Sequence, residues 1–290
     1  MGHTGTKLTA VVAALILWCS VGVAAQKATE ISFRLVDGWA ILVKGTLGGL
    51  PHQNLLIDTG AVPSAINSRV ARKLGLRGLS SQLSLINRSI AIETVVVPDV
   101  QLGPVGVAAL PMAAMDLGRI EQALATRIDA VVGLDLLANQ NFSIDYRRKR
   151  LDFDRVATVG SAIEFETKQE AGGTYILISL ADGNHTIKAL VDTGTKDLML
   201  FEQQLKGNLR LLDSRRQERS LNAGGTDHLS EVEMPSVRLG PLSWRKQKAY
   251  LWRTPEDQLP EFDALLGPAA LGIAVVGFDF NRYVMWIETR

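Results

Sequence analysis

The sequence contains a single cysteine, Cys19, and it lies among the first 25 residues. The rest of the chain cannot form an internal disulfide, so cysteine usage does not indicate the redox compartment. The chain also lacks a His-Glu-x-x-His run, a Gly-x-Ser-x-Gly run and a glycine-rich phosphate-binding loop. These absences argue against zinc peptidases, serine hydrolases and nucleotide-dependent enzymes.

An excess of charge of either sign is missing as well. There are 31 Lys and Arg residues against 30 Asp and Glu residues, which leaves a formal net charge of +1. Because no long-range field favours a polyanion, we expect neither nucleic acid nor an anionic membrane surface as a partner. The 290 residues, 47% of them hydrophobic, suffice for one large or two medium domains with an ordinary core.

The N-terminal segment has a composition of its own. A short start with Lys7 precedes an uncharged apolar run over residues 8–25, and polar residues follow from Gln26. This pattern predicts a signal peptide over residues 1–25 and an exported protein, periplasmic or secreted. The alternative is an uncleaved anchor, because the apolar run is near the minimum length for a bilayer span. We expect no other contact with a membrane.

An internal repeat runs through the remainder of the chain. Asp58-Thr59-Gly60 and Asp192-Thr193-Gly194 each follow a run of apolar residues. A second pair of apolar runs ends at Gly133 and at Gly267, each 75 residues after the aspartate of its own half. The repeat predicts two halves built on one plan.

Both halves consist of short runs rich in Val, Ile and Leu, broken by Gly, Pro, Asn and Asp. Such runs are typical of strands and hairpins, so we predict a mainly β fold with a few short helices. We expect two similar lobes that face each other across a cleft, over residues 26–158 and 159–290. Their boundary falls in the small and partly polar segment 154–162.

A single Asp-Thr-Gly after a strand is also a reasonable turn, since Asp can cap an amide and Gly adopts positive φ. The duplication and the shared spacing favour a catalytic pair, Asp58 and Asp192. Attack of water on a peptide carbonyl needs a base for the water and an acid for the carbonyl oxygen, and two carboxyl groups that share one proton supply both. Since close like charges cannot both ionise easily, the pair should titrate as a unit with one raised pKa.

In these motifs, over most of residues 33–290, the sequence resembles the retropepsin-like aspartic peptidases, the retroviral-type and bacterial branch. The resemblance implies the acid-protease fold, with two fused barrel-like lobes related by a pseudo-twofold axis. It also implies a monomer that cleaves an extended peptide or protein substrate without a metal or cofactor. By this match Asp58 and Asp192 are the catalytic residues, and Thr59 and Thr193 hydrogen-bond across the lobe interface.

Glycines accompany both aspartates. Gly60 and Gly194 should let the two loops approach closely and leave backbone amides free to bond the carboxylates. Gly133 and Gly267 should make room for these loops for the same steric reason.

The two copies differ at the next position, where Ala61 stands against Thr195. In the family this residue often carries a hydroxyl that bonds the neighbouring aspartate and favours its charged form. Thr195 can do so for Asp192, whereas Ala61 cannot for Asp58. We therefore expect Asp58 to be the more easily protonated member, and the enzyme to work nearer neutrality than an acid-adapted relative.

Enzymes of this class close a hairpin flap over the substrate. In the second half Asn222, Ala223, Gly224 and Gly225 have the composition of a flap tip that offers backbone groups to a peptide, although an ordinary hairpin turn is the alternative. The equivalent segment of the first half lies within residues 83–94 and has neither glycine nor an aromatic residue.

Two functions follow from these observations. The leading hypothesis is an aspartic endopeptidase. The alternative is a catalytically weak protein that holds a peptide or an envelope ligand in the same interlobe cleft. The intact aspartates favour catalysis, and the unusual first flap favours the alternative.

Overall fold

The computed structural model of the chain is mainly β, as the sequence predicts, with four short α-helices in the described part. The described residues are 29–85, 88–153, 155–170, 173–205, 212–222, 225–253 and 260–290. The expected signal peptide lies outside them. None of the helices in these ranges is long and apolar enough to cross a membrane.

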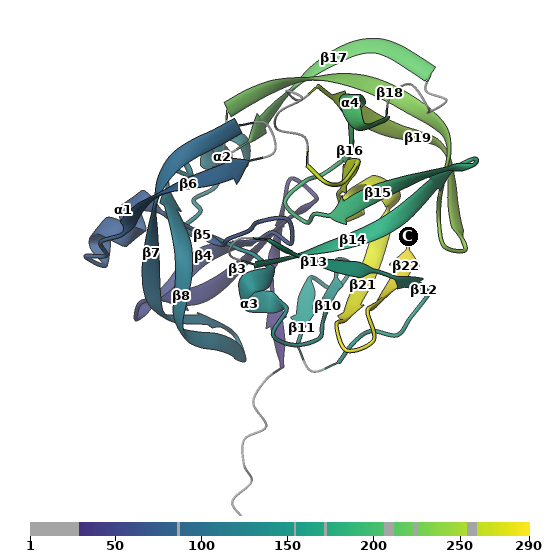
Figure 1. Ribbon diagram of the computed structural model, residues 1–290. Coiled ribbons are helices and arrows are strands. Elements are labelled where there is room, and N and C mark those ends of the chain that lie inside the picture. Colours follow the sequence, from purple (N-terminus) through teal and green to yellow (C-terminus); the bar gives the residue numbers. More distant parts are fainter. Residues whose placement is uncertain are drawn as a thin grey trace, which may run out of the picture.

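The first lobe is built on an eight-stranded sheet, drawn in purple to blue-green in Figure 1. In spatial order its strands are β2 (Arg34–Val36), β3 (Ala40–Leu47), β4 (Leu50–Ile57), β9 (Ala130–Val132), β5 (Ala65–Asn67), β8 (Val105–Met115), β7 (Arg88–Leu102) and β6 (Leu79–Leu85). Three helices belong to this lobe: α1 (Ser68–Lys73), α2 (Gly118–Ala123) and α3 (Leu134–Leu137).

The second lobe repeats this topology strand for strand. Its sheet has the order β13 (Glu166–Glu170), β14 (Gly173–Asp182), β15 (His185–Val191), β20 (Ala264–Leu266), β16 (Leu198–Phe201), β19 (Leu242–Trp252), β18 (Gly225–Leu239) and β17 (Leu212–Asn222). Helix α4 (Glu202–Leu205) follows β16, and a 3-10 helix, η2 (Pro268–Leu271), follows β20. The extra pairing of β3 with β7 recurs between β14 and β18. The two halves that repeat in the sequence therefore also have the same order of strands.

A six-stranded sheet joins the two lobes beneath them (Figure 1). Its order is β1 (Glu30–Ser32), β11 (Arg150–Asp152), β10 (Phe142–Asp145), β21 (Ile273–Asp279), β22 (Val284–Thr289) and β12 (Ser161–Glu164). The central pair is antiparallel, with Phe142 opposite Phe278. Each half of the chain thus supplies three strands, and the join is a continuous hydrogen-bonded ladder.

Strands β4 and β15, which lead to the two aspartates, are apolar on both faces at their ends. Leu55 and Ile57 belong to the central core, whereas Leu56 points to a separate apolar cluster on the opposite face. This division follows from the alternation of side chains along a strand. Leu190 lies in the corresponding cluster of the second lobe. A strand buried on both faces requires a continuous apolar run, as observed here.

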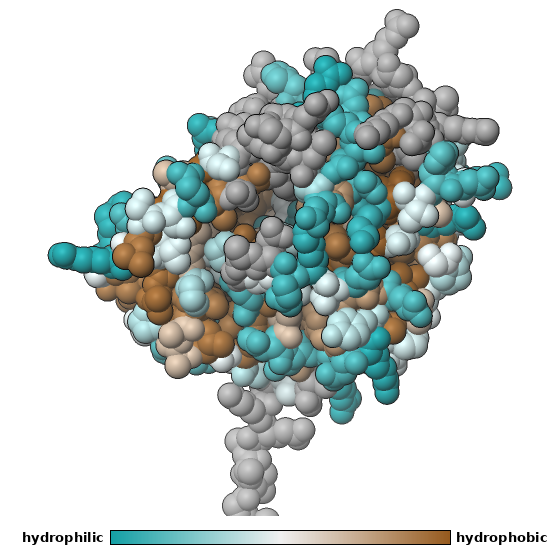
Figure 2. All heavy atoms as spheres, viewed as in Figure 1, coloured by the Kyte–Doolittle hydropathy of each residue, from teal (hydrophilic) through white to brown (hydrophobic). Residues whose placement is uncertain are grey.

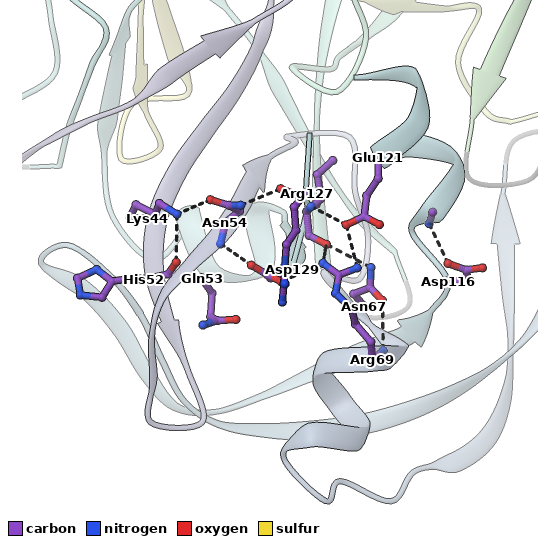
Figure 3. A network of polar contacts seen from close by, with 12 residues as sticks. Lys44, His52, Gln53, Asn54, Asn67, Arg69, Asp116, Glu121, Arg127 and Asp129 are labelled. Atoms are coloured by element: carbon purple, nitrogen blue, oxygen red, sulfur yellow. Dashed lines mark hydrogen bonds and ion pairs between the residues drawn. The ribbon is translucent and has the colours of Figure 1, made fainter. Parts of the chain in front are cut away.

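A polar network anchors β9 at the outer side of the first lobe (Figure 3). The buried carboxylate of Asp129 accepts a hydrogen bond from the Asn54 amide at 2.9 Å and pairs with Arg69 at 3.0 Å and Arg127 at 2.9 Å. Burial alone would raise the pKa of Asp129, but the Asn54 amide and the two arginines outweigh it and hold the pKa below its ordinary value. This network fixes the start of the strand that ends beside Gly133.

Candidate active site

Each aspartate leaves its strand at the point where a second strand of the same lobe passes alongside. The Asp58 amide donates to Val132 O at 3.0 Å, and the Asp192 amide donates to Leu266 O at 3.0 Å. These bonds extend the parallel pairing of β4 with β9 and of β15 with β20. Strands β9 and β20 are the apolar runs that lead to the glycines 75 residues after the aspartates in the sequence, and they therefore hold the two aspartates in position.

Thr59 and Thr193 bond the two loops to each other. The Thr59 hydroxyl donates to Val191 O at 2.7 Å and accepts from the Thr193 amide at 3.1 Å. In return the Thr193 hydroxyl donates to Ile57 O at 3.0 Å and accepts from the Thr59 amide at 3.0 Å. Both threonines are fully buried, so each hydroxyl satisfies one donor and one acceptor of the other lobe.

The two carboxyl groups lie against each other's loops. Gly60 donates its amide to Asp58 Oδ1 at 2.9 Å, and Gly194 donates to Asp192 Oδ1 at 2.7 Å. A Cβ on Gly60 would lie 2.7 Å from Cγ of Asp192, and one on Gly194 would overlap Cγ of Asp58. Only glycine fits at either position, because any side chain would displace the carboxyl group opposite.

The electrostatic environment makes the two aspartates unequal. Burial and the neighbouring negative charge of Asp58 raise the pKa of Asp192 well above its ordinary value. Burial also raises the pKa of Asp58, but its hydrogen bond with Asp192 and the amides of Gly60, Ala61 and Gly194 offset part of that effect. Burial thus raises both pKa values, and the pair holds a proton at a pH at which a free aspartate is ionised.

One part of the sequence-based expectation about the two aspartates was wrong. The expected hydrogen bond from Thr195 to Asp192 is absent: within the described part of the chain, the buried Thr195 hydroxyl has no hydrogen-bond partner. The Ala61 amide donates to the backbone carbonyl oxygen of Asp58 at 3.1 Å, and the Thr195 amide donates to that of Asp192 at 3.3 Å. The physical reason is that the loop backbone directs the Gly60 and Gly194 amides at the two carboxylates, while the Thr195 side chain makes no hydrogen bond to either.

Gly133 and Gly267 lie directly behind the loops. A Cβ on Gly133 would overlap Ala61 O, and one on Gly267 would overlap Thr195 O. Both glycines therefore allow the backbone after each Asp-Thr-Gly to approach the end of the neighbouring strand.

The two hairpins proposed as flaps occupy equivalent places in the lobes. Strands β17 and β18 pair up to Asn222 opposite Gly225, and Ala223 and Gly224 lie outside the described residues. Strands β6 and β7 pair up to Leu85 opposite Arg88. Strand β17 reaches the first lobe, where it lies beside α2. The surface is hollowed between the two hairpins (Figure 2).

Sequence reasoning missed one polar pair next to the Asp58 loop, formed by Ser64 and Asp135. The Ser64 amide donates to Asp135 Oδ2 at 2.7 Å. A signal was available, since the equivalent positions of the second half hold Leu198 and Ala269. The part of the chain that the structure describes holds no group of three or more His, Cys, Asp or Glu side chains placed to bind a metal ion.

Residues 43–136 match the family model described as Aspartyl protease. The matched segment runs from β3 into α3 and includes both Asp58 and Gly133. The match supports the resemblance to aspartyl proteases that the motifs indicated for this segment, and the mainly β architecture is consistent with the predicted fold class. A search of curated proteins finds no match. The second lobe lies beyond the matched segment, and its likeness to the first rests on the shared strand order.

Proposed function

We propose that this protein is an active aspartic endopeptidase in which Asp58 and Asp192 together activate one water molecule. The observation that carries the proposal is the contact between the two carboxyl groups, each packed against the glycine of the other loop. Both aspartates keep part of their surface accessible to solvent, so water can reach the pair. The Thr59 and Thr193 bonds keep the loops in register while the reaction proceeds.

Each aspartate has its own role in this mechanism. Ionised Asp58 accepts a proton from the water as its oxygen attacks the peptide carbonyl, and protonated Asp192 donates its proton to the carbonyl oxygen. The product of this step is a tetrahedral diol. Its collapse breaks the C–N bond, the leaving nitrogen takes the proton from Asp58, and a diol hydroxyl returns a proton to Asp192. No covalent bond to the enzyme forms at any stage.

Two apolar clusters suit the flanking side chains of an extended peptide. The first-lobe cluster includes Leu56, two residues before Asp58, and the second-lobe cluster includes Leu190, two residues before Asp192. Because side chains two apart share a face of a strand, each cluster lies on the face toward which its aspartate points. We propose that these clusters bind apolar substrate side chains on either side of the scissile bond.

The two clusters differ in the size of their side chains. In the first lobe Ala65 lies opposite Ala113 on neighbouring strands, whereas in the second lobe Met199 lies opposite Tyr250 at the same place in the sheet. The second-lobe cluster also contains Trp252. The two sides of the cleft should therefore prefer side chains of different size.

Hydrolysis by purified protein tests this function. Unfolded protein substrate is incubated from about pH 3 to about pH 8 with wild type, Asp58→Asn and Asp192→Asn, with and without a statine-type inhibitor. Asp99→Asn, at an exposed carboxylate, is the matched control. We expect cleavage by wild type and the control only. Cleavage that survives either active-site substitution would contradict the shared mechanism, and binding of peptide without cleavage at any pH would favour a peptide-binding function.

The predicted leader is proposed as an export signal, which places the enzyme in the periplasm or outside the cell. The test is N-terminal sequencing of protein recovered from an expressing culture. A mature N-terminus at Gln26 in the exported fraction supports the proposal, and an intact N-terminus in a membrane fraction favours the anchor.

A further inference from the structure

A buried serine and a carboxylate clamp the Asp58 loop from behind. The Ser64 hydroxyl donates to Asp135 Oδ1, and the Ser64 amide donates to Asp135 Oδ2 at 2.7 Å. The same hydroxyl accepts a hydrogen bond from the Gly133 amide at 2.9 Å. Ser64 is fully buried, so these bonds are shielded from competing water. Both oxygens of one carboxylate are thus used to hold a single residue.

These contacts lead back to the dyad through the backbone. Ser64 ends the loop that begins at Asp58, and Ala61 lies between them. The Ala61 carbonyl oxygen lies where a Cβ on Gly133 would be, and the Ala61 amide donates to the backbone carbonyl oxygen of Asp58 at 3.1 Å. Within this turn the Gly60 amide donates to Asp58 Oδ1 at 2.9 Å. The position of Ser64 relative to Gly133 therefore sets the position of this turn and the direction of its Gly60 amide.

The second lobe has no such clamp at the equivalent residues. Leu198 and Ala269 occupy the places of Ser64 and Asp135. There the Gly267 amide donates to a backbone carbonyl, Asp197 O, at 3.0 Å. The two halves share the threonine bonds, the amide bond from each aspartate to the neighbouring strand and the glycine amide bond to each carboxylate, whereas the clamp exists only on the side of Asp58.

We propose that Ser64 and Asp135 are positioning residues for hydrolysis, which hold the Asp58 loop so that the Gly60 amide stays aimed at the Asp58 carboxylate. The proposal rests on the proposed endopeptidase function. Neither residue is assigned to contact the substrate. Their effect passes through the loop backbone to the aspartate that acts as base.

The consequence for catalysis can be measured in two ways. Hydrogen bonds from amides favour the charged form of a carboxylate, so a loop that loses the clamp gives Asp58 a higher pKa. Asp192 is the titratable neighbour that acts on Asp58, and it remains in place. The acid limb of the plot of kcat against pH should then move to higher pH. Substrate binding should change little, because the clamp lies behind the loop.

Ser64→Ala is compared with Ser143→Ala, a matched control. Ser143 is also buried and also uses its hydroxyl twice, as donor to Arg155 O at 2.9 Å and as acceptor from the Ala157 amide at 2.6 Å, but it lies in β10 of the six-stranded sheet. We expect Ser64→Ala to lower kcat about tenfold with KM nearly unchanged, and to move the acid limb upward by about half a pH unit or more. Ser143→Ala should change neither. Ser64→Thr, which keeps the hydroxyl, should restore most of kcat.

Asp135→Asn is the second variant, because it keeps the size of the side chain and should reproduce the upward shift even if Ser64→Ala folds poorly. The proposal is overturned if a folded Asp135→Asn or Ser64→Ala protein keeps the wild-type kcat and the wild-type acid limb. It is also overturned if Ser143→Ala lowers kcat and shifts the acid limb as much as Ser64→Ala does.

The wild-type and Asp58→Asn assays test separately whether the protein is an endopeptidase, so a failure of that function is not mistaken for a failure of the clamp. If wild type does not cleave, hydrogen exchange at the Ala61 and Gly133 amides still tests whether Ser64 holds the Asp58 loop. Faster exchange in Ser64→Ala than in Ser143→Ala supports the clamp, and equal exchange refutes it.

Discussion

Thr59 and Thr193 each donate a hydroxyl hydrogen bond to the carbonyl oxygen that directly precedes the other lobe's aspartate, at Val191 and Ile57. Each hydroxyl also accepts the amide of the other threonine. The two halves of the site are therefore bonded to each other and not only packed together. Any change in one loop is transmitted to the other through these four bonds.

Thr59→Val should destabilise the protein by about 2 to 4 kcal/mol, because it keeps the shape but leaves Val191 O and the Thr193 amide buried without a partner. Thr59→Ser keeps the hydroxyl and should lose much less. Denaturant unfolding of both variants and wild type measures the difference. A serine variant as unstable as the valine variant would show that packing of the methyl group matters more than the bonds.

Asp192 should take up a proton before Asp58 as the pH falls. Its pKa is raised by burial and by the charge of Asp58, whereas Asp58 has three amides that stabilise its ionised form. Carboxyl carbon NMR across a pH titration, assigned with Asp58→Asn and Asp192→Asn, gives the order. Protonation of Asp58 first would contradict the environment described here and would support the order expected from the sequence.

Thr195→Val should leave the pH profile unchanged and should not destabilise the protein. The Thr195 hydroxyl is buried and has no hydrogen-bond partner among the described residues, so its removal relieves a desolvation cost of about 1 to 3 kcal/mol. Thermal unfolding and the pH dependence of kcat test both parts. A shift of the acid limb in this variant would reveal a bond from Thr195 to Asp192 during the reaction.

The Asp129 network should make the first lobe sensitive to acid. Since the folded pKa of Asp129 lies below its unfolded value of about 3.9, its stabilisation is fully present above that pH and is lost as the pH falls through the folded pKa. Asp129→Asn should therefore be less stable than wild type at neutral pH, with a difference that shrinks in acid. Denaturant unfolding at several pH values, with Asp99→Asn as control, checks this. A difference independent of pH would contradict it.

Met199→Ala should enlarge the second-lobe side of the cleft and Ala65→Met should narrow the first-lobe side. A peptide library with varied residues around the scissile bond should show opposite shifts in preferred size, on opposite sides of that bond. A change of one apolar contact of this kind is worth about 10- to 200-fold in kcat/KM. Identical shifts from both variants would show that the two clusters do not face different subsites.

The repeated elements of the site could be found in the sequence alone. Asp58, Gly60 and Gly133 recur as Asp192, Gly194 and Gly267 because each lobe meets the same steric requirement: a carboxylate on a tight loop, with glycines where two backbones touch. The apolar runs that precede them follow from strands buried on both faces. Each of these requirements concerns residues that are neighbours on one loop or one strand, so each is visible as a short pattern of consecutive residues.

The tertiary structure alone decided how the two halves differ. The order of protonation depends on which amides point at each carboxylate and on burial that both lobes create together, neither of which is encoded by the residue next to Asp58. Ser64 and Asp135 lie 71 residues apart, and each is an unremarkable polar residue until the fold places them in contact. The direction of a hydrogen bond and the polarity of its surroundings are properties of the assembled loops, so the sequence determined the pair of aspartates and the fold determined the surroundings of each.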